Sequence, residues 1–211
     1  MGIFITFEGP EGSGKSTQCR LLAEHLQSLG RRVLLTREPG GTEISQQVRH
    51  ILMDLKNKSM YPATEFLLFS AARAQLVREV IRPHLDKGEI VICDRYRDSS
   101  LAYQGYGHGL PLDTIRAVNA FATDALTPDL TLLLDIDPER GIHRKQAHNA
   151  EWNRMDDYAL AYHQRVRQGF LALAAAEPGR WRVLNADKPA EELQEEVRAV
   201  VLREQRATLD V

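Results

Sequence analysis

Five short apolar runs, separated by stretches with helical periodicity, limit the folds open to this chain of 211 residues. Most of the runs are continuous rather than alternating, as expected for strands that are buried on both faces of a parallel sheet. The predicted strands are Ile3–Glu8, Val33–Arg37, Ile90–Asp94, Leu130–Asp135 and Trp181–Asn185. The predicted helices span 15–29, 43–54, 65–87, 111–126, 138–148, 153–176 and 189–206. This order predicts a single α/β domain over 1–211, with a five-stranded parallel sheet flanked by helices.

The composition is that of an ordinary globular protein. Apolar residues make up 43% of the chain and charged residues 27%, which excludes disorder and collagen-like repeats. The net charge of −2 argues against binding nucleic acid over a large surface. The two cysteines, Cys19 and Cys93, and the seven histidines show no metal-ligand spacing. No apolar run approaches the ~20 residues of a membrane span. We therefore expect a cytoplasmic protein that binds neither nucleic acid nor membrane.

A glycine-rich loop joins the first predicted strand to the first predicted helix. It fits the pattern G-x-x-x-x-G-K-[ST] in the strand–loop–helix context that the pattern requires. Its backbone N–H groups and the helix N-terminus suit phosphate oxygens. Lys15 is predicted to reach the β- and γ-phosphates, and the Ser16 hydroxyl to ligate Mg²⁺. The predicted nucleotide-binding residues are Gly9, Pro10, Glu11, Gly12, Ser13, Gly14, Lys15, Ser16 and Thr17.

Asp94 ends the third predicted strand, where a phosphate-loop protein places a second carboxylate beside the metal. Asn185-Ala186-Asp187-Lys188 has the letters of the GTPase motif N-K-x-D in the wrong order, and the transporter element L-S-G-G-Q is missing. The leading interpretation is a small kinase with the three-layer fold of P-loop nucleoside triphosphate hydrolase-like proteins. A switch that hydrolyses ATP or GTP is the alternative from another class.

Further stretches resemble the bacterial thymidylate kinases, and the resemblance covers essentially the whole chain. The matching segments are 7–17, 36–42, 69–73, 94–96, 99–105 and 128–135. The resemblance implies a homodimer that uses Mg²⁺ and ATP to phosphorylate dTMP to dTDP, a step in DNA precursor synthesis. Within kinases, an enzyme for another pyrimidine nucleotide or for a deoxynucleoside is the alternative.

Phe69 and Arg73 stand four residues apart on one predicted helix and so share a face. An aromatic ring beside a bidentate donor suits a nucleobase with carbonyl edges. The resemblance implies that Phe69 stacks on thymine and that Arg73 donates to its carbonyl oxygen. A core phenylalanine beside a solvated arginine is the alternative interpretation.

Arg95 directly follows Asp94, and its guanidinium suits a pair of phosphate oxygens. The resemblance implies that Arg95 holds the 5′-phosphate of dTMP, with Arg37 as a second candidate. It places Tyr103 against the sugar, leaving no room for a 2′-hydroxyl, and Glu11 at the 3′-hydroxyl. The remaining implied contacts with dTMP are Ser99, Ser100 and Gln104, of which the last two are expected near the base edge.

A basic segment over 140–154 follows the fourth predicted strand. On charge alone it fits a solvated basic face. The resemblance implies a mobile lid at about 138–156 that closes over the triphosphate and supplies a catalytic arginine. The expected arginine cluster here reads Arg144-Lys145-Gln146-Ala147-His148, and a usual Asp-Arg reads Asn153-Arg154. We expect Arg144 first, then Arg154 or Lys145, to act with Lys15 and Arg95 in catalysis. A monophosphate acceptor is already anionic at neutral pH, with a second pKa of ~6, so we nominate no general base.

Overall fold

The computed structural model describes residues 2–147 and 152–209, and its strands form a five-stranded parallel sheet. The strand order is β2-β3-β1-β4-β5. In register, Phe7 of β1 pairs with Asp94 of β3, which brings the phosphate loop beside the end of β3. The strands are β1 (Ile3–Glu8), β2 (Val33–Arg37), β3 (Ile90–Asp94), β4 (Leu130–Asp135) and β5 (Trp181–Asn185). The predicted sheet and all five strand ranges are confirmed.

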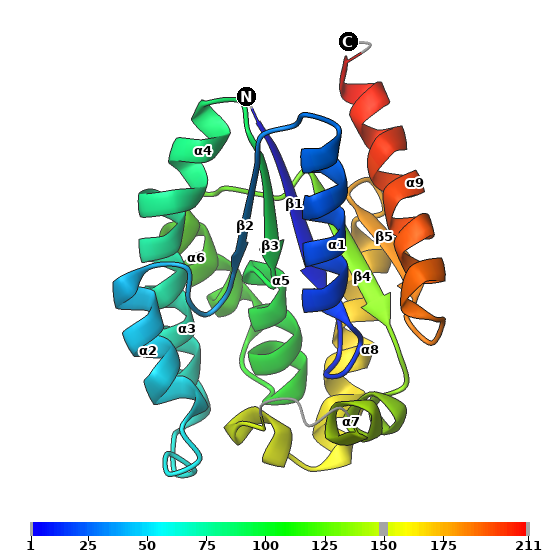
Figure 1. Ribbon diagram of the computed structural model, residues 1–211. Helices are drawn as coiled ribbons and strands as arrows, with labels where there is room; N and C mark the ends of the chain where they lie inside the picture. The colour runs from blue at the N-terminus through cyan, green and yellow to red at the C-terminus, as the bar shows by residue number, and fades with distance from the viewer. Residues whose placement is uncertain (1, 148–151, 210–211) are drawn as a thin grey trace.

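Helices cover both faces of the sheet and give three layers (Figure 1). On one face, α1 (Lys15–Ser28) and α9 (Ala190–Leu209) pack over side chains of β1, β4 and β5. On the other face lie α3 (Pro62–Leu76), α6 (Leu112–Thr123) and α8 (Leu160–Ala176). The shorter segments are α2 (Glu43–Met53), η1 (Val77–Ile81), α4 (Arg82–Asp86), α5 (Arg97–Ser100), η2 (Leu101–Gly107), α7 (Pro138–Ala147) and η3 (Arg154–Asp157).

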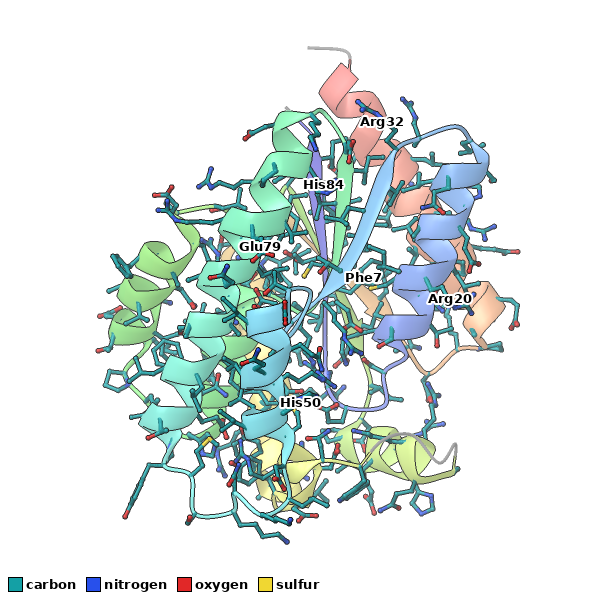
Figure 2. The ribbon with its side chains drawn as sticks, turned by 60° about the vertical axis from the view of Figure 1, so that its left-hand side comes forward. Phe7, Arg20, Arg32, His50, Glu79 and His84 are labelled. Atoms are coloured by element: carbon teal, nitrogen blue, oxygen red, sulfur yellow. The ribbon has the colours of Figure 1, made fainter. Side chains whose placement is uncertain are left out.

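The core follows the alternation of side chains along β1. Phe7 is fully buried in the layer beneath α1, whereas Phe4 points to the opposite layer and packs edge-on against Tyr96. Figure 2 shows Phe7 in the interior and Arg20 on the outer side of α1, where its guanidinium pairs with the exposed Glu24. None of the helices that the described residues form is long and apolar enough to cross a membrane.

Three helical segments differ from the prediction. The helix predicted over 65–87 begins at Pro62 and turns π-helical in η1, which ends two residues before Pro83, whose ring nitrogen has no N–H to donate. The helix predicted over 153–176 is divided by extended backbone at Tyr158 and Ala159. The helical run formed by α5 and η2 was not predicted, because its serine and glycine residues are weak helix formers. Part of this run is π-helical, a geometry that recurs at functional sites.

Candidate functional site

A cavity of about 750 Å³ opens at the carboxyl ends of the strands, where ligands bind in open parallel sheets. Loops that follow β1, β2 and β3 converge there, as the strand order requires. The predicted site residues that line it are Glu11, Gly12, Ser13, Gly14, Lys15, Ser16, Thr17, Arg37, Phe69, Arg73, Asp94, Arg95, Ser99, Ser100, Tyr103, Gln104, Arg144 and Lys145. Among the residues predicted for the site, Gly9, Pro10 and Arg154 do not line it.

The phosphate loop leads into α1 through Gly14, which has the left-handed conformation (φ 86°, ψ 13°). No side chain caps this helix N-terminus, so its positive end is directed to the cavity. The Lys15 ammonium is buried and donates to the carbonyl oxygens of Gly9 at 3.0 Å and Pro10 at 2.7 Å. Burial, with Arg95 nearby, lowers the pKa of Lys15 to about 8. The loop thus holds a cation inside its curve, next to free helix N–H groups.

The phosphate loop also touches α7 through backbone atoms. A Cβ atom on Gly12 would lie 1.8 Å from the carbonyl oxygen of Gly141, and one on Gly141 would lie 2.2 Å from that of Glu11. This approach requires glycine on both sides. The start of the basic segment is therefore packed against the phosphate loop, a contact that the sequence analysis did not anticipate.

Ser16 and Asp94 form the oxygen pair that was predicted to face Mg²⁺. The Ser16 hydroxyl donates to Oδ2 of Asp94, and both side chains line the cavity. A hydroxyl and a carboxylate are hard oxygen ligands of the kind that Mg²⁺ takes, usually together with water and phosphate oxygens. In the part of the chain that the structure describes, no cluster of three or more His, Cys, Asp or Glu side chains competes for a metal. The residues present fit a magnesium ion that is shared with a nucleotide.

The hydrogen-bond partners of Glu11 explain why a carboxylate lies inside an anion-binding loop. Its Oε1 accepts hydrogen bonds from Nη2 of Arg95 and from the Tyr103 hydroxyl, each at 2.9 Å. The Arg95 guanidinium carbon also lies 4.9 Å from the centre of the Tyr103 ring. Burial raises the pKa of Glu11, but Arg95 and Lys15 outweigh it and lower the pKa to about 2. Glu11 is therefore ionised at neutral pH and orders the two side chains across the cavity.

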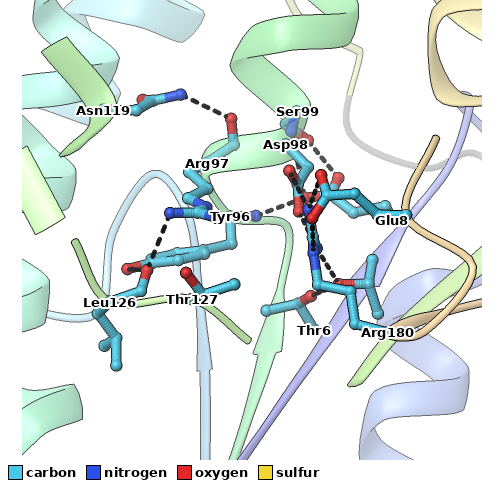
Figure 3. A network of polar contacts seen from close by, with 12 residues as sticks. Thr6, Glu8, Tyr96, Arg97, Asp98, Ser99, Asn119, Leu126, Thr127 and Arg180 are labelled. Carbon is cyan, nitrogen blue, oxygen red and sulfur yellow. Dashed lines mark hydrogen bonds and ion pairs between the residues drawn. The ribbon is translucent and has the colours of Figure 1, made fainter. Parts of the chain in front are cut away.

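Arg95 has a left-handed backbone (φ 70°), which is uncommon for a residue other than glycine and costs on the order of 1 kcal/mol. The buried Glu8 supports this turn through the residues that follow Arg95 (Figure 3). Its carboxyl group accepts from the backbone N–H of Tyr96 at 2.8 Å and of Ser99 at 3.2 Å, and from the Ser99 hydroxyl at 2.5 Å. Beneath it, Arg180 donates to both carboxylate oxygens of Asp98. The strain at Arg95 is thus held by a polar network in the core.

Arg73 and Phe69 lie on α3 and face the same cavity. Arg73 is 1% exposed, so the alternative of a solvated helix charge is wrong. Its Nε donates to Glu38 at 2.7 Å, and its Nη1 donates to the Ser100 hydroxyl at 3.1 Å. Arg37 also lines the cavity but is exposed. Arg73 is therefore a fixed donor in the cavity wall, and Arg37 is a solvated one.

Two basic side chains of α7 reach the cavity. Arg144 donates to Asp187 at 3.4 Å and to the backbone oxygen of Ala186 at 2.8 Å. Lys145 is held more tightly, because its ammonium lies 2.7 Å from both carboxylate oxygens of Asp156. The middle of the predicted lid, residues 148–151 and with it His148, lies outside the described residues.

Arg154, the other lid arginine, is not brought to the cavity. It is buried, and its guanidinium donates to Glu65 at 2.6 Å, to the hydroxyl of Tyr158 at 2.7 Å and to the backbone oxygen of Leu52 at 3.0 Å. These contacts anchor η3 to α3 and α2. A catalytic role for Arg154 stays a prediction that this arrangement does not favour.

Sequence reasoning did not find several residues of the cavity wall. On the acceptor side these include Glu38, Arg49 and Met53, and near α9 they are Lys188, Pro189, Ala190 and Leu193. The second group directly follows β5, and its place at the carboxyl end of a strand was the available signal. Arg49 gave no signal, because an arginine on an amphipathic helix is normally solvated.

Two basic walls meet in this cavity. One is the phosphate loop with Lys15, and the other carries Arg95, Arg73 and the Tyr103 ring. A hydrolytic switch has no use for the second wall, whereas an enzyme that transfers a phosphoryl group between two phosphorylated molecules needs both. The fold and the site define a P-loop nucleotide phosphotransferase.

Comparisons with known proteins identify the family. The thymidylate kinase family model matches residues 7–197. A thymidylate kinase of Roseiflexus sp. (strain RS-1) is 54% identical over 212 residues, which cover 95% of this chain and 94% of that protein. One of Deinococcus radiodurans is 52% identical over 200 residues, 95% and 96% of the two chains. A crystal structure of thymidylate kinase from Ehrlichia chaffeensis matches with a TM-score of 0.77 and 36% identity, covering 95% and 98%. The chain belongs to the thymidylate kinase family of nucleoside monophosphate kinases, as its motifs predicted.

Proposed function

We propose that this enzyme transfers the γ-phosphoryl group of Mg²⁺-bound ATP to the 5′-phosphate of dTMP, giving dTDP and ADP. The observation that carries the proposal is that Arg95 and Tyr103 converge on Glu11 of the phosphate loop, so that a second cationic side chain lies beside that loop in one cavity. Family membership supports the same reaction and does not favour another pyrimidine nucleotide, a deoxynucleoside or a switch. We also infer a cytoplasmic location, with which the two buried, unpaired cysteines agree.

The reaction requires the two phosphate groups to be aligned and does not require a general base. The 5′-phosphate is a dianion near neutral pH and can attack without losing a proton. The protein must then hold two repelling anions in line and spread the charge that develops between them. Lys15 contacts the donor phosphates, and Arg95 binds the acceptor phosphate. Ser16 and Asp94 would hold Mg²⁺, which would neutralise charge on the triphosphate.

The cavity wall that carries Arg95, Arg73 and Tyr103 would recognise the acceptor nucleotide. The Tyr103 ring lies against the deoxyribose and excludes a 2′-hydroxyl, while ionised Glu11 accepts from the 3′-hydroxyl. Phe69 stacks on the base, and Arg73 donates to a base carbonyl. The remaining polar contacts of this subsite are Arg37, Ser99, Ser100 and Gln104.

The deciding experiment measures ADP release from Mg²⁺-bound ATP with dTMP, dUMP, dCMP, UMP, thymidine or no acceptor. Strong turnover with dTMP, weaker turnover with dUMP and none with UMP is expected. Turnover with thymidine but not with dTMP would contradict the monophosphate mechanism. Equal ADP release with and without an acceptor would make the protein a hydrolytic switch.

In this proposal residues 138–156 form a lid, and the positive charge of Arg144 stabilises the transition state. Arg144 lines the cavity, and its half-exposed side chain is bound to the 186–187 turn, so it can exchange Asp187 for a phosphate oxygen. We expect Arg144→Ala to lower kcat about a hundredfold with little change in the KM for dTMP, measured by steady-state kinetics. Lys145→Ala should cost less, because Lys145 already neutralises Asp156. A kcat for Arg144→Ala within a factor of two of wild type would refute the assignment.

A homodimer is the proposed assembly. Three neighbouring helices carry apolar side chains that face outward: Ile51 of α2 (48% exposed), Leu67 of α3 (57%) and Phe121 of α6 (89%). Apolar groups gathered on adjacent helices are typical of a protein interface. Sedimentation equilibrium is expected to give twice the chain mass of 23.9 kDa, and Phe121→Asp to shift the protein to the monomer. A wild-type monomer at micromolar concentration would contradict the proposal.

A further inference from the structure

A buried carboxylate, Glu65, lies directly behind the cavity wall that faces the acceptor. It is 0% exposed and stands one helical turn before Phe69 on α3. It accepts from Nε2 of Gln104 at 2.8 Å, from the Tyr158 hydroxyl at 3.0 Å and from Arg154 at 2.6 Å. Glu65 does not line the cavity, so it acts there only through a neighbour.

Glu65 is ionised at neutral pH. Burial raises its pKa, but contacts from His108, Gln104 and Arg154 outweigh this and lower the pKa to about 2. An ionised carboxylate is an acceptor on both oxygens and has no hydrogen to donate. The amide of Gln104 can therefore meet Glu65 only with its NH₂ group.

This contact fixes which end of the Gln104 amide is left for a ligand. Gln104 is 2% exposed and lines the cavity. Among the described residues, none donates a hydrogen bond to its Oε1. Four residues earlier in the same helical run, Ser100 accepts from Arg73, whose guanidinium can only donate. The wall thus presents a donor, Arg73, and a fixed acceptor, the amide oxygen of Gln104.

We propose that Glu65 is a positioning residue that locks Gln104 as a hydrogen-bond acceptor and thereby selects acceptor nucleotides whose base carries a ring N–H beside a carbonyl group. Thymine and uracil present that edge, a C4 carbonyl next to N3–H. Cytosine presents the reverse, an amino group next to a bare N3, so a donor would meet a donor and an acceptor an acceptor. The inference rests on the proposed function and names the part of the base that the site reads.

The test compares Glu65→Gln with Glu65→Asp. A glutamine can donate to the Gln104 oxygen, so the amide is free to turn its NH₂ toward the base. We expect the ratio of kcat/KM for dTMP to that for dCMP to fall at least tenfold in Glu65→Gln, mainly through KM. Aspartate keeps an acceptor-only group, so Glu65→Asp should retain the ratio within about threefold even if both rates fall. Tyr158→Phe removes another hydrogen bond to Glu65 without touching Gln104 and should leave the ratio unchanged.

A second measurement uses the wild-type enzyme, in case Glu65→Gln does not fold. N3-methyl-dTMP lacks the N–H that Gln104 accepts, and its kcat/KM is expected to be at least tenfold below that of dTMP. The inference would be overturned if folded Glu65→Gln kept the wild-type ratio of kcat/KM for dTMP to that for dCMP, or if N3-methyl-dTMP were turned over as well as dTMP. In either case, turnover of dTMP by the wild-type enzyme would leave the proposed function standing. Wild-type enzyme that fails to phosphorylate dTMP would overturn the proposed function itself.

Discussion

Replacing Lys15 with methionine is expected to lower kcat by about a thousandfold, which corresponds to about 4 kcal/mol of transition-state stabilisation. The Lys15 ammonium sits inside the phosphate loop and is buried, so its charge acts at short range in a site with little water. Methionine has a similar volume and no charge, and the fold should survive. Single-turnover transfer from ATP to dTMP, measured with saturating substrates, separates this loss from weaker nucleotide binding.

Lys87→Met is the matched control for this prediction. Lys87 is exposed at the end of α4 and lies just before the amino end of β3, whereas the cavity lies at the carboxyl ends of the strands. It should keep wild-type kcat, and the Tm of both variants should stay within about 5 °C of wild type. If the Lys15→Met enzyme retained a tenth of wild-type kcat, the phosphate loop would not be the part of the site that stabilises the transition state.

The limits of the sheet could be predicted from the sequence because burial on both faces leaves a continuous apolar run with polar ends. The stretch Ile90–Cys93 closed by Asp94 is such a run, and the structure ends β3 at that aspartate. Helix limits were predictable where a stop or start residue stood, as at Thr42, whose side chain accepts from Ser45 N–H. The run from Arg97 to Gly107 carries no such signal, because packing against α8 rather than helix propensity holds it.

The site residues that are close in sequence could be predicted. The buried residues that hold them in place from behind could not. Lys15 and Ser16 are adjacent in the chain, and Arg95 follows Asp94. Glu65, in contrast, meets Gln104 and Arg154 across 39 and 89 residues. A buried glutamate on an amphipathic helix has the same sequence signature as a solvated one, since what distinguishes it is its partner. Glu8 was missed for the same reason, although it holds the backbone of the Arg95 turn.

Removing the Arg95 side chain is expected to lower kcat/KM for dTMP at least a thousandfold. Arg95 contacts Glu11 and the Tyr103 ring, so Arg95→Ala removes the ligand for the acceptor phosphate and one contact of each neighbour. The KM for ATP should change much less, because Lys15 keeps its own hydrogen bonds to the carbonyl oxygens of Gly9 and Pro10 when the Arg95 side chain is removed. The measurement is steady-state kinetics in each substrate with the other saturating.

Arg37 is the second candidate for binding the acceptor phosphate. Arg37→Ala should lower kcat/KM for dTMP by no more than about tenfold, because the Arg37 side chain is exposed.

Arg116→Ala on α6 is the control, since that side chain is exposed and pairs with Asp113 on the same helix. A double-mutant cycle then separates two reasons why Arg95 matters. If Arg95 served mainly to keep Glu11 ionised and in place, Glu11→Gln would cost as much as Arg95→Ala, and the double variant no more than either alone. If Arg95 binds the acceptor phosphate directly, Glu11→Gln should cost about tenfold while the Arg95→Ala loss persists in the Glu11→Gln background. We expect the second pattern, because the guanidinium matches a phosphate oxygen pair and Glu11 retains Lys15 and Tyr103 as partners. An Arg95→Ala enzyme within threefold of wild-type kcat/KM for dTMP would rule out a role for Arg95 at the acceptor phosphate.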